Sequence, residues 1–275
     1  MMKKILVTGC NGQLGRAIRQ EYKGEDVPLS IQMLRKVKGI VALDITDCEC
    51  CPCAGSCGET GCHYNCAAHT NVDACEQQWD AAYRINAIGP RNLSIAAREV
   101  GAKMIHVSTD YVFEGNGTKP YTEFDEIHPV SAYGKTKAEG EKFVREFADR
   151  YFIFRTAWLY GDGKNFVKTM LRLAESHDEV SVVCDQQGSP TSAVELARAI
   201  HHFEPTEIMV HFMQPVRRYQ LGSFAEAIFK RAGKTTKVNH VTSEQYAKMN
   251  PASANRPAYS ILENYMMKLT DGYKC

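Results

Sequence analysis

The sequence predicts an α/β protein in which a doubly wound parallel sheet carries a smaller C-terminal lobe. Three observations predict this architecture. A short apolar run at residues 4–7 leads directly into a glycine-rich turn. Strand-like runs then alternate with helix-like segments through most of the chain. A further strand ends in Ser108-Thr109 and is followed by a polar loop and a helix that begins near Tyr133. Such alternation is typical of a parallel sheet with helices on both faces.

The size and charge of the chain exclude several classes of protein. Its 275 residues, 44% of them hydrophobic, suffice for one large domain or for a large domain with a small one. Lys and Arg total 33 against 32 for Asp and Glu, so bulk charge does not favour a nucleic-acid or membrane surface. The first apolar run is too short for a signal peptide or a spanning helix. We therefore expect a cytoplasmic protein, in which the 11 cysteines do not form a disulfide framework.

The turn after the first strand has the composition of a nucleotide-binding loop. The run TGCNGQLG at residues 8–15 spaces its glycines three residues apart, and residues 16–22 read as a helix. Glycines there let the backbone approach a pyrophosphate, which the N–H groups of the helix N-terminus then hold. An ordinary strand-to-helix turn is the alternative. The position beside the first strand favours the nucleotide interpretation.

The second strand of such a fold should end in an acidic or amide residue that binds the adenosine ribose. Residues 31–39 supply no residue of this kind. Asp44, followed by Ile45, is the next candidate, and a helix cap is an equal alternative for its carboxylate. The ribose contact therefore stays open at this point.

Residues 65–70, NCAAHT, have side chains small enough for a cofactor to lie over the end of a strand. His69 either contacts the cofactor or has a structural role. Residues 80–98 follow with apolar side chains at helical spacing. Asn86 within this helix either bonds backbone near the site or is solvated.

The stretch from residue 103 to Lys137 predicts a proton-transfer site. Residues 103–107 form the expected strand, and Thr109 ends it. Tyr133 and Lys137 lie four residues apart, so they share one face of the following helix. A phenol has a pKa of about 10 and reacts poorly as an acid or base at neutral pH unless its charged form is stabilised. We expect Lys137, together with the charge of a nicotinamide in its oxidised state, to lower the pKa of Tyr133.

The remainder of the chain is expected to build the smaller lobe. Its predicted elements are helices within residues 161–177, 192–202 and 224–231 and a short strand at 180–183. Ser223 is the expected cap of the last helix and Gly233 its stop signal.

Eight segments of the sequence carry a resemblance to a known family. They are TGCNGQLG, NCAAHTNVD, STDYVFEG, YGKTKAEGE, FRTAWLYG, NFVKTMLRLA, DQQGSPT and NRPAYS. The chain resembles the extended, sugar-nucleotide branch of the short-chain dehydrogenase/reductase superfamily, and within it the dTDP-4-dehydrorhamnose reductase family. The resemblance implies a Rossmann-like NAD(P)-binding domain over residues 1–160. Residues 161–275 would form most of a substrate-binding lobe that is interleaved with this core and truncated at its C-terminus.

The resemblance also implies an activity, which is reduction by NADPH or NADH of the C4 ketone of dTDP-4-dehydro-L-rhamnose to give dTDP-L-rhamnose. Tyr133 would protonate the substrate oxygen, Thr109 would bond to it, and Lys137 would also hold the nicotinamide ribose. Together with the glycine turn, the implied cofactor-binding residues are Gly9, Gly12, Gln13, Leu14, Gly15, Asp44, Ile45, Ala68, His69, Thr70, Asn86, Tyr133 and Lys137. The implied substrate-binding residues are Thr109, Asp110, Trp158 and Arg256, the last suited to a diphosphate but equally consistent with a surface arginine.

Tyr111 separates this activity from a related one. Sugar-nucleotide 4,6-dehydratases carry an Asp-Glu pair after the corresponding threonine, whereas Thr109-Asp110 is followed here by Tyr111. This difference favours reduction. An epimerase or dehydratase of the same superfamily and a non-catalytic regulatory subunit remain the alternatives. The expected partners are a nucleotide-sugar substrate and a second copy of the chain in a homodimer, without nucleic acid or membrane, and no ligands for Mg²⁺ are assignable.

Residues 48–62, CECCPCAGSCGETGC, depart from the family pattern. The C-x-x-C spacings of Cys48 with Cys51 and of Cys50 with Cys53 make a zinc site one alternative. The other follows from the genetic code, because a one-base shift of reading frame turns this segment into a Val- and Ala-rich one that runs into a strand. We favour a pair of compensating frameshifts over a bound metal, and residues 31–39 and 207–221 fit the same explanation.

Overall fold

The computed structural model describes residues 5–23, 29–33, 41–47, 61–204, 211–213 and 218–270. Within these residues, seven strands form one sheet in which every pairing is parallel. In sheet order they are β11 (His211–Met213), β6 (Tyr151–Thr156), β5 (Lys103–Thr109), β4 (Cys62–Asn65), β1 (Ile5–Thr8), β2 (Leu29–Met33) and β3 (Val41–Ala42). The predicted doubly wound parallel sheet is confirmed.

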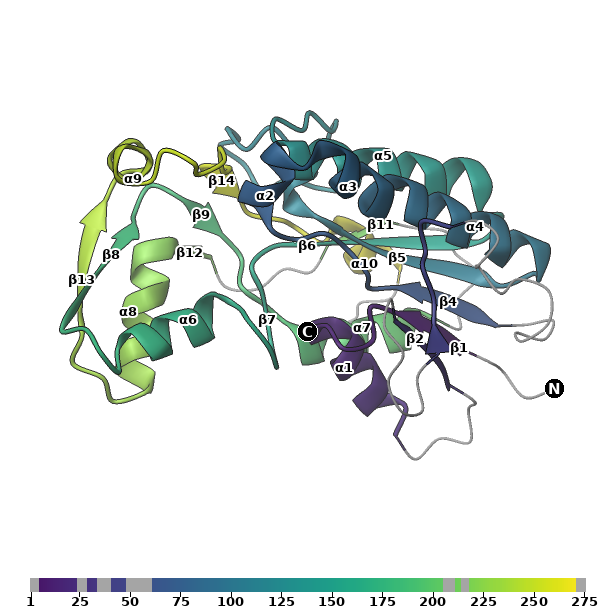
Figure 1. Ribbon diagram of the computed structural model, residues 1–275, viewed down its shortest axis with the longest axis horizontal. Coiled ribbons are helices and arrows are strands. Elements are labelled where there is room, and N and C mark those ends of the chain that lie inside the picture. Colours follow the sequence, from purple (N-terminus) through teal and green to yellow (C-terminus); the bar gives the residue numbers. More distant parts are fainter. Residues whose placement is uncertain are drawn as a thin grey trace.

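Helices cover both faces of the sheet (Figure 1). They are α1 (Gln13–Glu21) and α7 (Ala193–Phe203) on one face and α4 (Gly89–Glu99) and α5 (Ala132–Phe147) on the other. Successive side chains of a strand point to opposite faces. Ile5 and Val7 of β1 therefore join the core beneath α1 and α7, whereas Leu6 joins the core beneath α4 and α5. This two-sided burial explains why the strand reads as a continuous apolar run.

The order of the strands fixes where a ligand can bind. The chain winds outward from β1 through β2 to β3 and then returns through β4 on the other side of β1. In open α/β sheets, ligands bind at the carboxyl ends of the strands where the winding reverses. Here that point is the gap between the turn after β1 and the segment after β4.

The predicted helix over residues 80–98 contains a π-helical turn. Helix α2 (Val72–Gln77) is followed by α3 (Trp79–Tyr83), the π-helical turn Arg84–Ile88 and then α4. Such turns occur often at functional sites. This one brings the backbone carbonyl of Asn86 against Gly140 of α5, where a Cβ atom could not fit. Helix α5 is thereby held close to the segment that follows β4.

A second lobe lies to one side of the sheet (Figure 1). Its elements are the parallel pair β8 (Glu179–Val183) and β13 (Lys237–Val241), with helices α6 (Phe166–Leu173), α8 (Leu221–Arg231) and α9 (Ser243–Met249). A separate apolar core joins β8, α6 and α8. Strand β11 and helix α7, which lie late in the chain, belong to the sheet and its cover.

Short elements connect the two parts. They are β7 (Leu159–Tyr160), β10 (Thr191–Ser192), β9 (Gln187–Gly188), β12 (Tyr219–Gln220), β14 (Tyr259–Ser260), α10 (Tyr265–Thr270) and a 3-10 turn at Asp110–Val112.

The expected start of α8 was wrong. Because β12 pairs with β9 and runs directly into the helix, α8 begins at Leu221, and Ser223 lies inside its first turn. Gly233 follows the helix with a φ of 66°, as a stop signal requires.

Some sequence-based expectations fall on residues outside those described. These are the cysteine-rich residues 48–60 and the segments 34–39, 207–210 and 214–217. Residues 29–33 are described, and they form the expected second strand.

Across the described ranges, no helix is long and apolar enough to cross a membrane, and no three His, Cys, Asp or Glu side chains are grouped to hold a metal ion.

Candidate active site

Two cavities meet at the carboxyl edge of the sheet. The first, about 480 Å³ and here called the loop cavity, is lined by Gly9, Gly12 and the segment 43–46. The second, about 540 Å³ and here called the tyrosine cavity, is lined by Tyr133, Lys137 and Thr109 among others. Gly12, Cys66 and Ala68 line both cavities, so the two adjoin and are together called the cleft.

The glycine turn shapes the loop cavity. Gly9 has a φ of 64°, and a Cβ atom on it would lie 2.6 Å from the backbone nitrogen of Ala67. The N–H of Gly12 donates to the carbonyl of Gly9 at 2.9 Å, and Gly12 then caps α1. Gly15 does not line the cavity; it lets α1 approach Cys10, where a Cβ atom would meet the Cα atom at 2.6 Å. Two of the three glycines thus border the cavity beside a helix N-terminus, which suits an anionic group.

Asp44 and Ile45 lie at the far end of the loop cavity. Oδ1 of Asp44 accepts hydrogen bonds from the backbone nitrogen of Thr46 at 2.9 Å and from its hydroxyl at 2.7 Å. These bonds close a local turn, and no helix begins within the described residues 41–47, so the helix-cap alternative is not borne out there. Asp44 also lines the loop cavity, and its contact with a cofactor stays a prediction.

The segment after β4 divides between the cavity and the protein interior. Ala68 and Thr70 line the tyrosine cavity. His69 lines neither cavity, because its Nδ1 faces Cys75 Sγ at 3.2 Å. The structural alternative therefore fits the His69 ring better than a cofactor contact.

Asn86 also lies outside both cavities and cross-links their walls. Its Oδ1 accepts from the backbone nitrogen of His69 at 2.8 Å, and its Nδ2 donates to the His69 carbonyl at 3.2 Å. The same Nδ2 donates to Thr136 Oγ1 on α5 at 3.1 Å. Asn86 is thus placed to hold the segment after β4 against α5.

Helix α5 presents Tyr133 from its first turn. Ser131 caps this helix by accepting from the backbone nitrogen of Gly134 at 3.1 Å. Gly134 packs against the backbone of Tyr111, which leaves no room for a side chain. The ring of Tyr111 meets that of Tyr133 edge-on, with centroids 5.3 Å apart. The cap and the close packing fix the direction in which the phenol points.

The environment of Tyr133 favours its neutral form. Burial raises the pKa of Tyr133 above its ordinary value, and the hydrogen bond with Thr109 only partly opposes this rise. Lys137 is not among the groups that shift this pKa, and its Nζ donates to the carbonyl of Val107 at 2.6 Å. The lowering that we expect from Lys137 together with the oxidised nicotinamide stays a prediction.

Lys137 is almost completely buried, with 1% of its surface exposed. Burial lowers its pKa to about 8, and the carboxylate of Glu141, one turn further along α5, acts in the opposite direction. Glu141 in turn accepts from Arg155 Nε at 2.9 Å and from a second Arg155 nitrogen at 2.7 Å. This buried pair fastens the face of α5 that carries Lys137 to β6.

Asp110 and Trp158 border the tyrosine cavity on the side of the second lobe. Burial raises the pKa of Asp110 to about 6, although Thr109 Oγ1 donates to its Oδ1 at 2.9 Å. Trp158 has a φ of 46°, a left-handed conformation that is strained for a bulky side chain. Its indole fills the space beside Gly188, where a Cβ atom could not fit. Strain of this kind clusters at functional sites.

Arg256 lies in a third cavity of about 520 Å³, bordered by α6, β8 and α9. It forms an ion pair with Asp73 at 2.9 Å and donates to Ser253 Oγ at 2.6 Å. Its side chain is 30% exposed and is held by partners on two segments, so its contact with a diphosphate stays a prediction.

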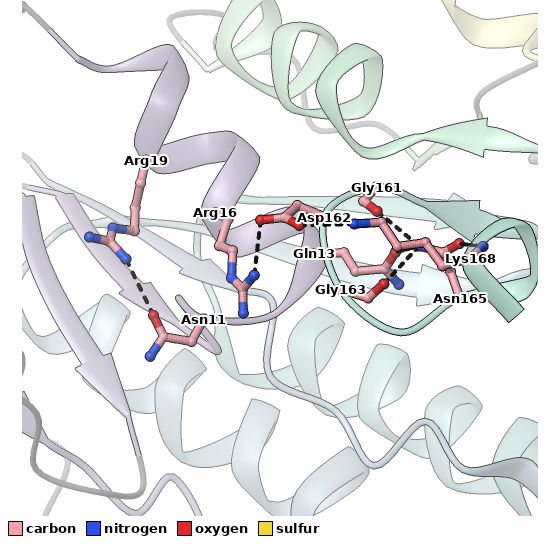
Figure 2. Close-up of polar contacts among 9 residues, drawn as sticks. All are labelled: Asn11, Gln13, Arg16, Arg19, Gly161, Asp162, Gly163, Asn165 and Lys168. Carbon is pink, nitrogen blue, oxygen red and sulfur yellow. Dashed lines mark hydrogen bonds and ion pairs between the residues drawn. The ribbon is translucent and has the colours of Figure 1, made fainter. Parts of the chain in front are cut away.

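The sequence-based reasoning missed Lys164 and Asn165, which line the tyrosine cavity. Figure 2 shows Asn165 at the centre of a set of polar contacts, with its Nδ2 2.8 Å from Gln13 Oε1 and 2.8 Å from the carbonyl of Gly161. Asn165 also caps α6 by accepting from the backbone nitrogen of Lys168 at 2.9 Å. An asparagine directly before an apolar periodic segment was the signal that could have identified it.

Comparison with known proteins identifies the family. The model of the RmlD substrate binding domain matches residues 2–275. The chain belongs to this family. A crystal structure of a dTDP-4-dehydrorhamnose reductase from Clostridium acetobutylicum is 46% identical and superposes with a TM-score of 0.89, covering 97% of this chain and 92% of that one.

Two further relatives extend the comparison. The dTDP-4-dehydrorhamnose reductase of Bacillus anthracis, solved in complex with NADP, is 37% identical, has a TM-score of 0.86 and covers 98% of this chain and 94% of its own. The spore coat polysaccharide biosynthesis protein SpsK of Bacillus subtilis is 38% identical over 96% of this chain and 90% of its own length. This RmlD family member therefore has relatives that match almost its whole length.

Proposed function

We propose that this chain is an NAD(P)H-dependent oxidoreductase that reduces the C4 ketone of dTDP-4-dehydro-L-rhamnose to dTDP-L-rhamnose, a step of dTDP-rhamnose biosynthesis. One observation carries the proposal: Thr109, Tyr133 and Lys137 line a cavity that Gly12 of the glycine turn also lines. The names of the C. acetobutylicum and B. anthracis relatives support the same activity.

The residues present fit a nicotinamide dinucleotide. The glycine turn has no room for side chains at Gly9, and the N-terminus of α1 opens into the cleft at Gly12. When bound, the cofactor supplies the hydride. Gly12, Gln13 and Leu14 would hold its pyrophosphate, Asp44 and Ile45 the adenine end, and Ala68 and Thr70 the middle.

Tyr133 would act as the proton donor. Because burial raises its pKa, the phenol enters the reaction protonated. Its hydroxyl can then give its proton to the C4 oxygen as the carbon is reduced. Thr109 would bond to the same oxygen, and the Lys137 amine would hold the nicotinamide ribose.

The second lobe would bind the nucleotide sugar. Trp158 and Asp110 border the tyrosine cavity on the sugar side, and Arg256 lines the third cavity, between α6, β8 and α9. A guanidinium group suits the diphosphate of the substrate. We therefore assign residues 1–160 mainly to cofactor binding and most of 161–275 to substrate binding. Strand β11 and helix α7 are the exceptions, because they belong to the sheet and its helical cover.

A turnover assay tests the proposal. Purified protein is mixed with NADPH or NADH and dTDP-4-dehydrorhamnose, and loss of reduced cofactor is followed with identification of the sugar product. We expect Tyr133→Phe to reduce turnover by about 10²–10⁴-fold, and Tyr83→Phe, a tyrosine stacked on Trp79 away from the cleft, to leave it unchanged. An absence of turnover by the native chain with both cofactors overturns the proposal.

The same assay separates the alternative activities. An epimerase or dehydratase would convert a nucleotide sugar without net loss of reduced cofactor, and a regulatory subunit would bind without turnover. Tyr111 stands where the compared dehydratases carry a glutamate, which supports reduction.

We also propose a cytoplasmic homodimer that acts without nucleic acid or membrane. The near balance of 33 basic and 32 acidic residues supports the absence of a nucleic-acid surface. Light scattering of the purified protein measures the oligomeric state, and a monomeric mass contradicts the dimer.

A further inference from the structure

Four buried polar side chains form a line beneath the cleft. Thr8, Asn65 and His106 stand at the same level of the sheet, because Thr8 pairs with Asn65 and Asn65 pairs with His106 across β1, β4 and β5. Lys137 of α5 completes the line, and none of the four is more than 2% exposed. Each hydrogen in this line must therefore be placed by its neighbours rather than by water.

The orientation of the Asn65 amide is fixed by a backbone group. The N–H of Ala67 can only donate, and it lies 3.2 Å from Asn65 Oδ1. Thr8 Oγ1 donates to the same oxygen at 2.9 Å. Nδ2 of Asn65 therefore points the other way, toward His106 Nδ1 at 3.1 Å.

The Asn65 amide then selects the tautomer of His106. Since Nδ2 is a donor, Nδ1 of His106 must accept and carries no hydrogen. Burial lowers the pKa of His106 well below its ordinary value, and the charge of Lys137 lowers it further, so the ring is neutral. A neutral ring without hydrogen on Nδ1 carries it on Nε2. That atom faces Lys137 Nζ at 3.4 Å.

We propose that His106 is a positioning residue for the proton-transfer site. Its Nε2–H disfavours the ammonium form of Lys137. The same N–H leaves the Nζ hydrogens directed toward the Val107 carbonyl and the cleft. The catalytic part of this inference rests on the proposed function. An N–H group facing an ammonium is repelled, whereas a neutral amine can accept from it. His106 thereby acts on the reaction through Lys137 and does not touch the substrate.

Other charged groups act on the same pair from the packed elements. Glu141 and Arg145 of α5 influence His106, and Glu141 together with the Cys66 thiol after β4 influences Lys137. Glu141 favours the charged lysine, while burial disfavours it. The imidazole N–H adds to burial, so its removal should shift the balance toward the ammonium.

The tautomer can be measured without turnover. In protein labelled with ¹⁵N-histidine, long-range NMR correlations distinguish a bare Nδ1 from a protonated one, and the His106→Phe variant assigns the signal. We expect a bare Nδ1, a protonated Nε2 and no titration of His106 between pH 6 and 8. A protonated Nδ1 overturns the proposal even if the enzyme is active.

The effect on Lys137 is tested with two variants and a matched control. His106→Phe removes the opposing N–H, and Asn65→Asp reverses the tautomer because a carboxylate accepts from Nδ1–H. Both should raise the pH at which Lys137 loses its proton by about one unit, read from the Nζ signal in ¹⁵N-lysine-labelled protein and from the alkaline limb of kcat. The KM for the sugar should stay unchanged.

His63→Leu is the control, because His63 is a buried histidine on β4 that does not contact Lys137. It should leave the Lys137 titration in place. An unchanged Nζ titration in both test variants overturns the proposal. If the native chain has no turnover but the Nζ titration shifts as expected, the proposed function fails and the action of His106 on Lys137 stands.

Discussion

Asn165 Nδ2 lies 2.8 Å from Gln13 Oε1, and this hydrogen bond joins the cap of α6 to the first residue of α1 (Figure 2). Gln13 borders the tyrosine cavity, as does Asn165 itself. Gly163, with a φ of 135°, lets the connecting loop fold over Gln13. The segment that leads into the second lobe is therefore fastened to the turn that we propose to hold the cofactor.

Replacing Asn165 tests this connection. Asn165→Ala removes the cap of α6 and the bond to Gln13, so we expect a loss of about 1 kcal/mol in the free energy of unfolding and a several-fold increase in KM for the cofactor. Chemical denaturation and initial rates measure the two effects. Asp162→Asn is the control, because Asp162 only forms exposed ion pairs with Arg16 and Lys168. Equal effects of the two variants would contradict a specific role for Asn165.

His63 is a buried histidine whose removal should stabilise the protein. It is 1% exposed, and neither ring nitrogen has a well-formed hydrogen bond among the described residues. Burial lowers its pKa to about 4 from 6.5, with a small opposing effect from the backbone at Leu93. The folded state thus binds a proton less readily than the unfolded chain, so stability present above pH 6.5 is lost as the pH falls toward 4.

His63→Leu removes this penalty. The free energy of unfolding of the variant should exceed that of the native chain. We expect this difference to increase by up to about 3 kcal/mol as the pH is lowered from 6.5 to 4. Urea denaturation at a series of pH values measures the difference. A constant difference across this range would mean that His63 does not titrate as its burial requires.

The ion pair between Arg155 and Glu141 is required for α5 to stay in place. Both side chains are buried, with Arg155 2% and Glu141 0% exposed. Arg155→Met removes two short hydrogen bonds from the buried carboxylate and leaves it the longer contact with Arg145, so it should lower the free energy of unfolding by about 3 kcal/mol. Arg145→Met is the control, because Arg145 reaches the same carboxylate from a half-buried site and should cost about 1 kcal/mol or less. Similar losses in both variants would mean that burial does not decide the effect.

Asp110 should show opposite effects on stability and on substrate binding. Burial raises its pKa to about 6 from 3.8, so the stability it contributes below pH 3.8 is lost as the pH rises through 6. Asp110→Asn should therefore stabilise the protein at pH 7, by up to about 3 kcal/mol. If Asp110 contacts the sugar, KM for the sugar should increase at the same time. A stabilised variant with native KM would remove Asp110 from the substrate site.

Local rules in the sequence were sufficient for the sheet and for the outline of the site. The apolar run at residues 4–7, the glycine turn and the spacing of Tyr133 and Lys137 depend only on neighbours in the chain, so β1, α1 and the face of α5 could be predicted. The resemblance of eight segments added the activity, and the family match from residue 2 to 275 agrees with it.

Contacts between distant segments decided the remainder. The sequence could not show that His69 turns toward Cys75, that Trp158 takes a left-handed conformation, or that Asn165 reaches Gln13. The charge state of Lys137 depends on its burial and on Glu141, and β5 brings His106 to within 3.4 Å of its Nζ. Patterns in sequence report the environment that each element needs, but the protonation of a buried group depends on all the elements packed around it. The sequence by itself therefore determined the sheet and predicted which residues transfer a proton, and only the tertiary structure decided which protonation state the surroundings of each residue favour.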